Sequence, residues 1–283
     1  MCGTNTPEPN PMYGDPTQRR RKAGRRRGRG HGLLPGMTAS FAGPIGVTEV
    51  HRLGSLLSIW AHPDDETFLA GGLMATAVDL GQRVTCVSAT AGELGTSDPV
   101  AWPPERLGQV RRWEAAAAMA ILGITDHRFL DLPDGGLADL DPAEPVARIV
   151  DLIEEVQPDT ILTFGPDGAT FHPDHRTVSA WVTEAWRRAG RPARLLHQAE
   201  SEPHLRRWAA EYERWGIYMS DERPVGVPEE KLAVRLVAEG RLGDRKHAAL
   251  CAMHTQIAPS LAALGEDLFR AMNAEEAFVE VSA

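Results

Sequence analysis

The chain has 283 residues, of which 42% are hydrophobic and 24% charged, and its formal net charge is -9. This composition fits one large globular domain or two small ones, and the acidity disfavours general binding to nucleic acid or anionic lipid, which are also negatively charged. No apolar run approaches the roughly 20 residues of a membrane span, and three widely spaced cysteines without a CxxC pair favour a reducing, cytoplasmic location over a disulfide framework or a thiolate zinc site.

Residues 1–50 are expected to form a disordered basic tail, and residues 51–283 one folded domain. The first segment is rich in Pro, Gly and Arg, and contains eight basic and three acidic residues. It has too few apolar side chains to offset the entropy lost on ordering. Its arginine run could contact nucleic acid, but we favour a solvated tail or sequence upstream of a true start at Met37.

From residue 52 onward, segments typical of strands and helices alternate. Short apolar or β-branched runs predict strands at residues 53–60, 82–90, 127–132, 159–165 and 192–199. Helical spacing, initial prolines and terminal glycines predict helices at residues 66–81, 103–123, 141–157 and 173–190. Such alternation implies parallel strands with right-handed helical crossovers. We therefore predict an α/β fold, a three-layer sandwich around a mostly parallel sheet.

The sequence after residue 200 is less regular. Residues 200–216 and 241–256 have helical patterns, whereas residues 230–239 suit a strand or a helix equally well. The final apolar run, residues 277–282, is a candidate edge strand. No linker separates a second domain.

Polar clusters follow four of the expected strands at the point where each strand ends. In chain order they are "HPDDE", "AGELGTSD", "LPDGGL" and "GPDGATFHPDH". The carboxyl ends of parallel strands meet at one edge of a sheet, and open α/β folds bind their ligands there. We expect the functional site at this edge.

Two histidine motifs, "HPDD" at residues 62–65 and "HPDH" at residues 172–175, consist of residue types that bind divalent metals. Each is also a common turn sequence by itself, but their positions after two strands of the same sheet favour a metal. Zinc binds neutral imidazole and carboxylate, and a catalytic site leaves one position for water. We predict that His62, Asp65 and His175 bind zinc, with iron(II) as the other suitable ion.

The same motifs leave Asp64 and His172 beside the expected metal. Zinc lowers the pKa of a bound water to about 7, so that Asp64 could take its proton and later protonate a leaving amine. His172, kept protonated by Asp174, could stabilise an oxyanion. These three residues are therefore predicted to be catalytic in the hydrolysis of an amide or ester.

Six segments carry a resemblance to a known family: "AHPDDE", "TAGELGT", "RRWEAAAAMAILG", "LPDGGL", "HPDH" and "KHAALCAMHTQ", between about residues 55 and 257. Their order and spacing resemble the GlcNAc-phosphatidylinositol de-N-acetylase (PIG-L, LmbE-like) family, which includes the mycothiol and bacillithiol pathway deacetylases. The resemblance implies a Rossmann-like core and a zinc-dependent hydrolase of N-acetylglucosaminyl groups, with the same metal ligands, base and oxyanion stabiliser.

The resemblance also implies that Arg111, Asp134 and Glu93 contact the sugar. Each residue has a structural alternative. Arg111 could pair with Glu114 across one helical turn, Asp134 could only shape the "PDGG" turn, and Glu93 could only cap the loop that follows it.

One position departs from the mycothiol-type deacetylases, in which a tyrosine stands two residues before the first histidine of the second motif. This chain has Thr170 there, so proton delivery would fall to Asp64 or a water. We expect an enzyme that removes an acetyl or other acyl group from the amine of an N-acylglucosaminyl small molecule. The alternatives are an amidase acting on glucosaminyl thiol conjugates and a non-catalytic sugar-binding protein; similar proteins suggest a homo-oligomer.

Overall fold

The structure is a computed structural model that describes residues 44–282. The strands are β1 (Leu56–Trp60), β2 (Val84–Ser88), β3 (Asp126–Phe129), β4 (Thr160–Thr163), β5 (Arg194–Gln198), β6 (Val234–Val237) and β7 (Glu275–Glu280). The helices are α1 (Asp65–Asp79), α2 (Pro104–Leu122), α3 (Ala143–Val156), α4 (Gly168–Phe171), α5 (Pro173–Arg188), α6 (Glu202–Arg214), α7 (Gly240–Ala252), α8 (His254–Leu264) and α9 (Glu266–Met272). Short 3-10 helices occupy Val47–Leu53, Leu137–Asp139 and Glu229–Lys231.

The strands form one sheet in the order β3-β2-β1-β4-β5-β7-β6. Strands β1 to β5 pair in parallel, whereas β7 is antiparallel to both β5 and β6. All five residues of β1 are buried, as expected for a parallel strand that is covered on both faces. The predicted α/β fold with a mostly parallel sheet is confirmed.

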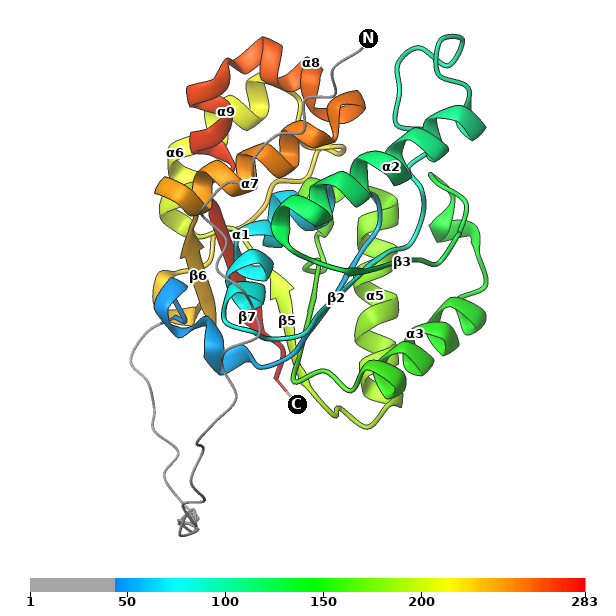
Figure 1. Ribbon diagram of the computed structural model, residues 1–283, viewed down its shortest axis with the longest axis vertical. Helices are drawn as coiled ribbons and strands as arrows, with labels where there is room; N and C mark the ends of the chain where they lie inside the picture. Colours follow the sequence, from blue (N-terminus) through cyan, green and yellow to red (C-terminus); the bar gives the residue numbers. More distant parts are fainter. Residues whose placement is uncertain (1–43, 283) are drawn as a thin grey trace, which may run out of the picture. The chain divides into compact units, whose positions relative to one another are not determined.

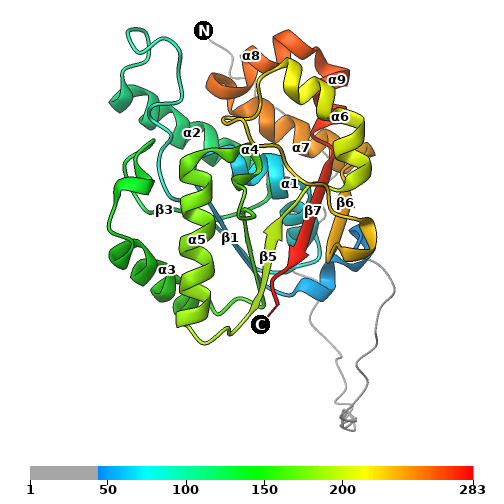
Figure 2. The same cartoon turned by 180° about the vertical axis from the view of Figure 1, so that it is seen from behind.

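Helices cover both faces of this sheet (Figures 1 and 2). Helices α1, α2 and α7 pack together on one face, and α3 packs against α5 on the other. Helix α2 ends where Gly123 adopts a left-handed conformation with φ 80°, which glycine reaches without steric cost. The helices predicted on either side of the sheet are therefore present and form the outer layers of the three-layer sandwich.

The strand order reverses between β1 and β4. From β1 the chain proceeds through β2 to β3 on one side, and from β4 to β5 on the other. The loops that leave β1 and β4 therefore diverge at the carboxyl ends of these strands, which is where α/β sheets bind ligands. Both histidine motifs follow these two strands.

Two expectations about the ends of the domain need correction. Residue Ile45 is 3% exposed and forms a bridge with Val234, so the folded part starts before residue 51. The rest of the expected tail, residues 1–43, lies outside the described residues. The run expected to be an edge strand, residues 277–282, lies in β7 as far as Glu280, and β7 lies inside the sheet because β6 occupies the edge. Among the described residues, no helix is sufficiently long and apolar to cross a membrane.

Candidate active site

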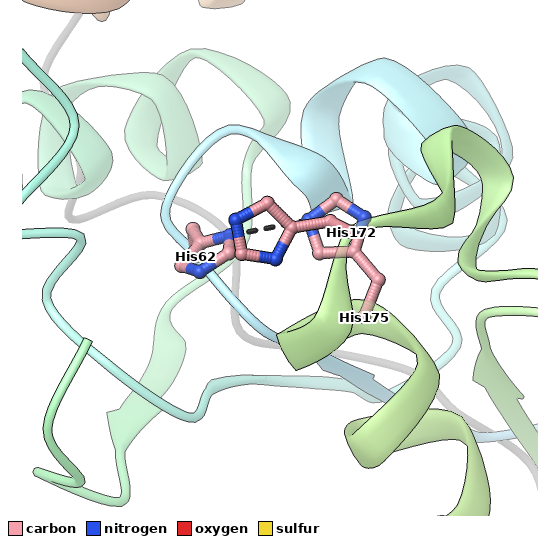
Figure 3. Close-up of side chains that lie close together, drawn as sticks. All are labelled: His62, His172 and His175. Atoms are coloured by element: carbon pink, nitrogen blue, oxygen red, sulfur yellow. Dashed lines mark hydrogen bonds between the residues drawn. The ribbon is translucent and has the colours of Figure 1, made fainter. Parts of the chain in front are cut away.

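The three predicted metal ligands lie together beyond the ends of β1 and β4, and Figure 3 shows two of them, His62 and His175, beside His172. The Nδ1 atom of His62 is 3.1 Å from Nε2 of His175. The carboxylate of Asp65 lies 3.5 Å from the first of these nitrogens and 3.3 Å from the second. All three residues are buried. His62 comes from the loop after β1, Asp65 is the first residue of α1, and His175 lies in the first turn of α5.

The ring of His175 is held so that one nitrogen faces the other two side chains. Its Nδ1 lies 2.9 Å from the carbonyl oxygen of Gly168, which can only accept, so Nδ1 carries the proton and Nε2 has a free lone pair. Burial lowers the pKa of His175 to about 4. The ring of Phe164 stacks on His175 with centroids 4.3 Å apart and planes 13° apart. A neutral, fixed imidazole is the form that binds a metal ion.

The other side of the His62 ring faces two more carboxylates. Its Nε2 is 3.0 Å from Asp134 and 3.4 Å from Asp174. Burial by itself would lower the pKa of His62, but hydrogen bonds to Asp134, Asp174 and Asp65 raise it well above its usual value. A metal-binding histidine commonly donates its second N–H to a carboxylate, which fixes the tautomer and leaves the first nitrogen for the metal.

The donor set therefore fits a divalent metal ion. Two imidazole nitrogens and one carboxylate converge on one point from separate elements, and each imidazole has its second nitrogen bonded elsewhere. Two overlapping sets of side chains also lie close enough to share an ion, namely His62 with His172 and His175, and His62 with Asp134 and Asp174. This buried His/Asp cluster could hold a metal.

Asp64 lies beside the cluster in a strained backbone conformation with φ 128°. Residues other than glycine rarely adopt such a conformation, and surrounding contacts must stabilise it. The carboxylate of Glu66 accepts the Asp64 N–H at 3.1 Å, and Arg111 donates to the preceding carbonyl, that of Pro63, at 2.5 Å. Burial raises the pKa of Asp64 to about 7, against the lowering effect of Arg111. A carboxylate with this pKa suits a general base at neutral pH.

The relation between His172 and Asp174 differs from the prediction. His172 caps α5, and its Nδ1 accepts the Asp174 N–H at 3.1 Å, so that this nitrogen carries no proton. The Asp174 carboxylate instead accepts the N–H groups of Gly135 and Leu137, at 2.8 and 3.0 Å. Burial and the nearby His62 lower the pKa of His172. Asp174 therefore does not keep His172 protonated, but the neutral ring still offers an Nε2–H donor.

Arg111 is almost completely buried and makes its contacts within the protein. Besides Pro63, it donates to the carbonyl of Gly92 at 2.7 Å and to the Asp64 carboxylate at 3.1 Å. The alternative pair with Glu114 does not form, because Glu114 accepts from the backbone and hydroxyl of Thr255. Arg111 thus joins the loops after β1 and β2, and its contact with a sugar stays a prediction.

The carboxylates of Glu93 and Asp134 connect the loops after β2 and β3 by hydrogen bonds, because each accepts a backbone N–H from the other loop. Glu93 Oε1 accepts the Asp134 N–H at 3.0 Å, and Asp134 accepts the N–H of Leu94 at 2.7 Å. Within the described part of the chain, Glu93 Oε2 is one of the few buried side-chain atoms that have no hydrogen-bond partner. A hydroxyl group could satisfy it, and substrate contact by both residues stays a prediction.

Sequence reasoning assigned no role to Glu66 or Phe164, although the structure places both against the site. Glu66 belongs to the "HPDDE" motif, so its position next to Asp64 was a signal in the sequence. Phe164 follows β4, and only the fold brings it under His175. Thr170, at the position of the expected tyrosine, lies 3.4 Å from His175 Nδ1.

Comparison with known proteins identifies the family. The sequence pattern of the family described as GlcNAc-PI de-N-acetylase (PIG-L) matches residues 57–186. A Saccharomonospora viridis protein named 1D-myo-inositol 2-acetamido-2-deoxy-alpha-D-glucopyranoside deacetylase is 30% identical over 253 residues, which cover 79% of this chain and 94% of the relative. The chain belongs to the GlcNAc-PI de-N-acetylase family. The resemblance inferred from the motifs is therefore confirmed.

Two further comparisons bear on how far the similarity extends. A Kineococcus radiotolerans protein with the same name is 35% identical over 166 residues, which cover 48% of this chain and 46% of the relative, so the match spans about half of that relative. The structure of the A40926 pseudoaglycone deacetylase Dbv21 superimposes with a TM-score of 0.59 at 23% identity, and the match covers 81% of this chain and 97% of that chain. The second similarity supports the fold.

Proposed function

We propose that this PIG-L family member is a zinc-dependent amidohydrolase that removes an acetyl group from the amine of an N-acetylglucosaminyl small molecule. The observation that carries the proposal is the convergence of His62, Asp65 and His175 beside Asp64 and His172. The named activity of relatives at 30 to 35% identity supports the acetylated amino sugar as substrate. A cytoplasmic location, expected from the cysteines, is part of this proposal.

His62, Asp65 and His175 would hold the ion. A bound zinc ion would polarise the amide carbonyl and lower the pKa of a water molecule to about 7. Two imidazole nitrogens and one carboxylate suit zinc, and iron(II) is the alternative. The Asp134 and Asp174 carboxylates behind His62 would fix its orientation.

Asp64 and His172, beside the expected metal, would have different roles in the reaction. Asp64, as a carboxylate, takes a proton from the attacking water, and Arg111 holds it in place through their 3.1 Å contact. His172 donates from Nε2 to the oxygen on which negative charge develops, since its Nδ1 already accepts a hydrogen bond. Asp64 then returns its proton to the leaving amine. Without a tyrosine at position 170, Asp64 serves as both base and acid.

The test is removal and return of the metal. We expect chelation to abolish acetate release from N-acetylglucosaminyl-inositol and from simple N-acetylglucosaminides, and zinc to restore it. Supplying iron(II) anaerobically to the same apoprotein identifies the better ion. Full activity in a preparation shown by elemental analysis to contain no metal would overturn the proposal.

The same assay distinguishes the two alternative functions. An amidase for glucosaminyl thiol conjugates would release cysteine faster than acetate from the matched substrates. A non-catalytic sugar-binding protein would bind the acetylated sugar in calorimetry without releasing acetate at any metal concentration. The presence of both the base and the complete ligand set favours an enzyme.

A further inference from the structure

A buried ion pair lies against the middle of α1, away from the reacting groups. Lys246 on α7 and Glu276 on β7 are 2.7 Å apart, and their side chains are 3% and 0% exposed. Charged side chains are seldom buried to this extent unless they are paired and hydrogen-bonded. The pair lies within the part of the chain that the structure describes, and no role in the proposed reaction has been assigned to it so far.

Both charges bond the backbone of α1. Glu276 accepts the N–H of Gly72 and that of Leu73, each at 2.7 Å. Lys246 donates to the carbonyl of Phe68 at 2.7 Å. In a regular helix that carbonyl is the partner of the N–H four residues later, which belongs to Gly72. The ion pair therefore contacts both the carbonyl and the N–H of this helical step.

The close approach depends on glycine at position 72. A Cβ atom there would lie 3.1 Å from Leu236, 3.2 Å from the Glu276 carboxylate and 3.3 Å from Ala238. These distances are shorter than ordinary carbon contacts, which lie near 3.5 to 4.0 Å. Helix α1 thus lies directly on β6 and β7 at the turn that the ion pair binds.

The bonded turn is adjacent to the active-site turn. The Phe68 N–H donates to the carbonyl of Asp64 at 2.9 Å, while the Phe68 carbonyl accepts from Lys246. Phe68 therefore links Lys246 of the ion pair to the strained Asp64 through its two backbone hydrogen bonds. Asp65 lies within the same helical turn. A shift of this turn would move the base and a metal ligand together.

Stability alone does not require such a pair. Removing two charges from water is costly, and replacing a buried ion pair by apolar side chains of similar size is often neutral or stabilising. The distinctive effect of the pair is geometric, because it ties the Phe68 carbonyl to α7 and the N–H groups of Gly72 and Leu73 to β7.

We infer that Lys246 and Glu276 are positioning residues that hold the first turn of α1 in register, and so set the positions of Asp65 as ligand and Asp64 as base. The inference rests on the proposed function for its effect on turnover. Its effect on metal binding can be measured separately.

The test is the double variant Lys246→Met/Glu276→Leu, which removes both charges and their bonds to the backbone of α1. We expect zinc affinity, measured by competition with a chromophoric chelator, to fall about 10- to 100-fold, the usual effect of losing groups that orient metal ligands. At saturating zinc we expect kcat to fall at least about 10-fold with KM nearly unchanged, because the base is displaced while the sugar contacts remain.

The control is Arg245→Met/Asp79→Asn, which removes an ion pair between the same two helices at the far end of α1. Arg245 bonds Asp79 at 2.8 and 2.9 Å, and both side chains are partly exposed. We expect its zinc affinity and kcat to equal those of the wild type. Glu276→Gln keeps the shape and one carbonyl oxygen, and we expect intermediate values.

The outcomes separate the two proposals. If the double variant melts within a few degrees of the wild type and keeps wild-type zinc affinity and kcat, the positioning role is wrong. If it does not fold, Glu276→Gln decides, since unchanged zinc affinity in that variant overturns the role equally. A wild-type protein that binds zinc but releases no acetate overturns the proposed function and leaves the zinc measurement as the test of positioning.

Discussion

The proposed role of Asp64 as base makes its neighbour Arg111 a sensitive position. The Nη2 atom of Arg111 lies 3.1 Å from the Asp64 carboxylate, with the two side chains 4% and 17% exposed. Burial raises the pKa of Asp64 to about 7 even though Arg111 lowers it. An opposite charge at such a distance lowers a carboxyl pKa by about 1 to 3 units. Arg111→Met should therefore raise the pKa of Asp64 by about that amount.

The sign of the effect on activity follows from the form in which the base works. Asp64 accepts a proton only as a carboxylate, so activity falls as the pH drops through its pKa. Raising the pKa moves this acid limb of kcat/KM to higher pH by about 1 to 3 units. Below the limb, the variant should be roughly 10- to 1000-fold slower at a given pH. A bound divalent cation lowers the Asp64 pKa in both proteins, so the difference between them persists.

The assay is release of the free amine between pH 5 and 10 at saturating zinc, with Arg111→Lys as the control. Lysine keeps the positive charge but cannot make the three contacts to Pro63, Gly92 and Asp64. We expect Arg111→Lys to lower the plateau and leave the limb close to its wild-type position. A rise in KM in both variants would support the predicted sugar contact. An acid limb that does not move in Arg111→Met would show that Asp64 is not the titrating base.

Three further variants test the other parts of the site. Asp64→Asn should lose about 100- to 10,000-fold in kcat and keep its zinc by elemental analysis; retained turnover would contradict the assigned base. His172→Ala should lose about 100- to 1000-fold in kcat with little change in KM, and a change confined to KM would argue against oxyanion stabilisation. Phe164→Ala should destabilise the protein by about 3 to 5 kcal/mol in chemical denaturation, because this fully buried ring packs on Trp60 and His175; full stability would mean that the ring contributes no core packing.

The parallel part of the fold could be predicted because each element has a local signal. Strand β1 is an apolar run, and α2 begins with proline and ends before glycine. The sheet beyond β5 lacks such signals. The pattern of β6 suited a helix as well, and the partner of β7 depends on contacts between segments far apart in the chain. An apolar run at the end of a sequence predicts a strand, but it does not predict whether that strand pairs with one neighbouring strand or with two.

The sequence could predict which side chains of the candidate site lie together, but less well which contacts they make. Two motifs after two strands sufficed to bring His62, Asp65 and His175 together. The sequence suggested that Asp174 serves its neighbour His172, but the side chain turns to the N–H groups of Gly135 and Leu137. The carboxylate of Asp174 thus bonds backbone N–H groups of a loop that is distant in the sequence. The residues next to Asp174 in the sequence do not predict this contact.

The adjacent aspartates of the first motif lie in different electrostatic environments. Burial raises the pKa of Asp64 to about 7. Asp65 is buried as well, but His175 and His62 beside it lower its pKa to about 2. Environments that separate the pKa values of neighbouring carboxylates are a means of dividing acid–base roles. The lowered pKa of Asp65 favours the carboxylate form that a metal ligand requires, and the raised pKa of Asp64 is in keeping with its proposed role as base. The strained backbone at Asp64 turns the two side chains to different partners, so that exchanging their roles would require a different fold of the loop.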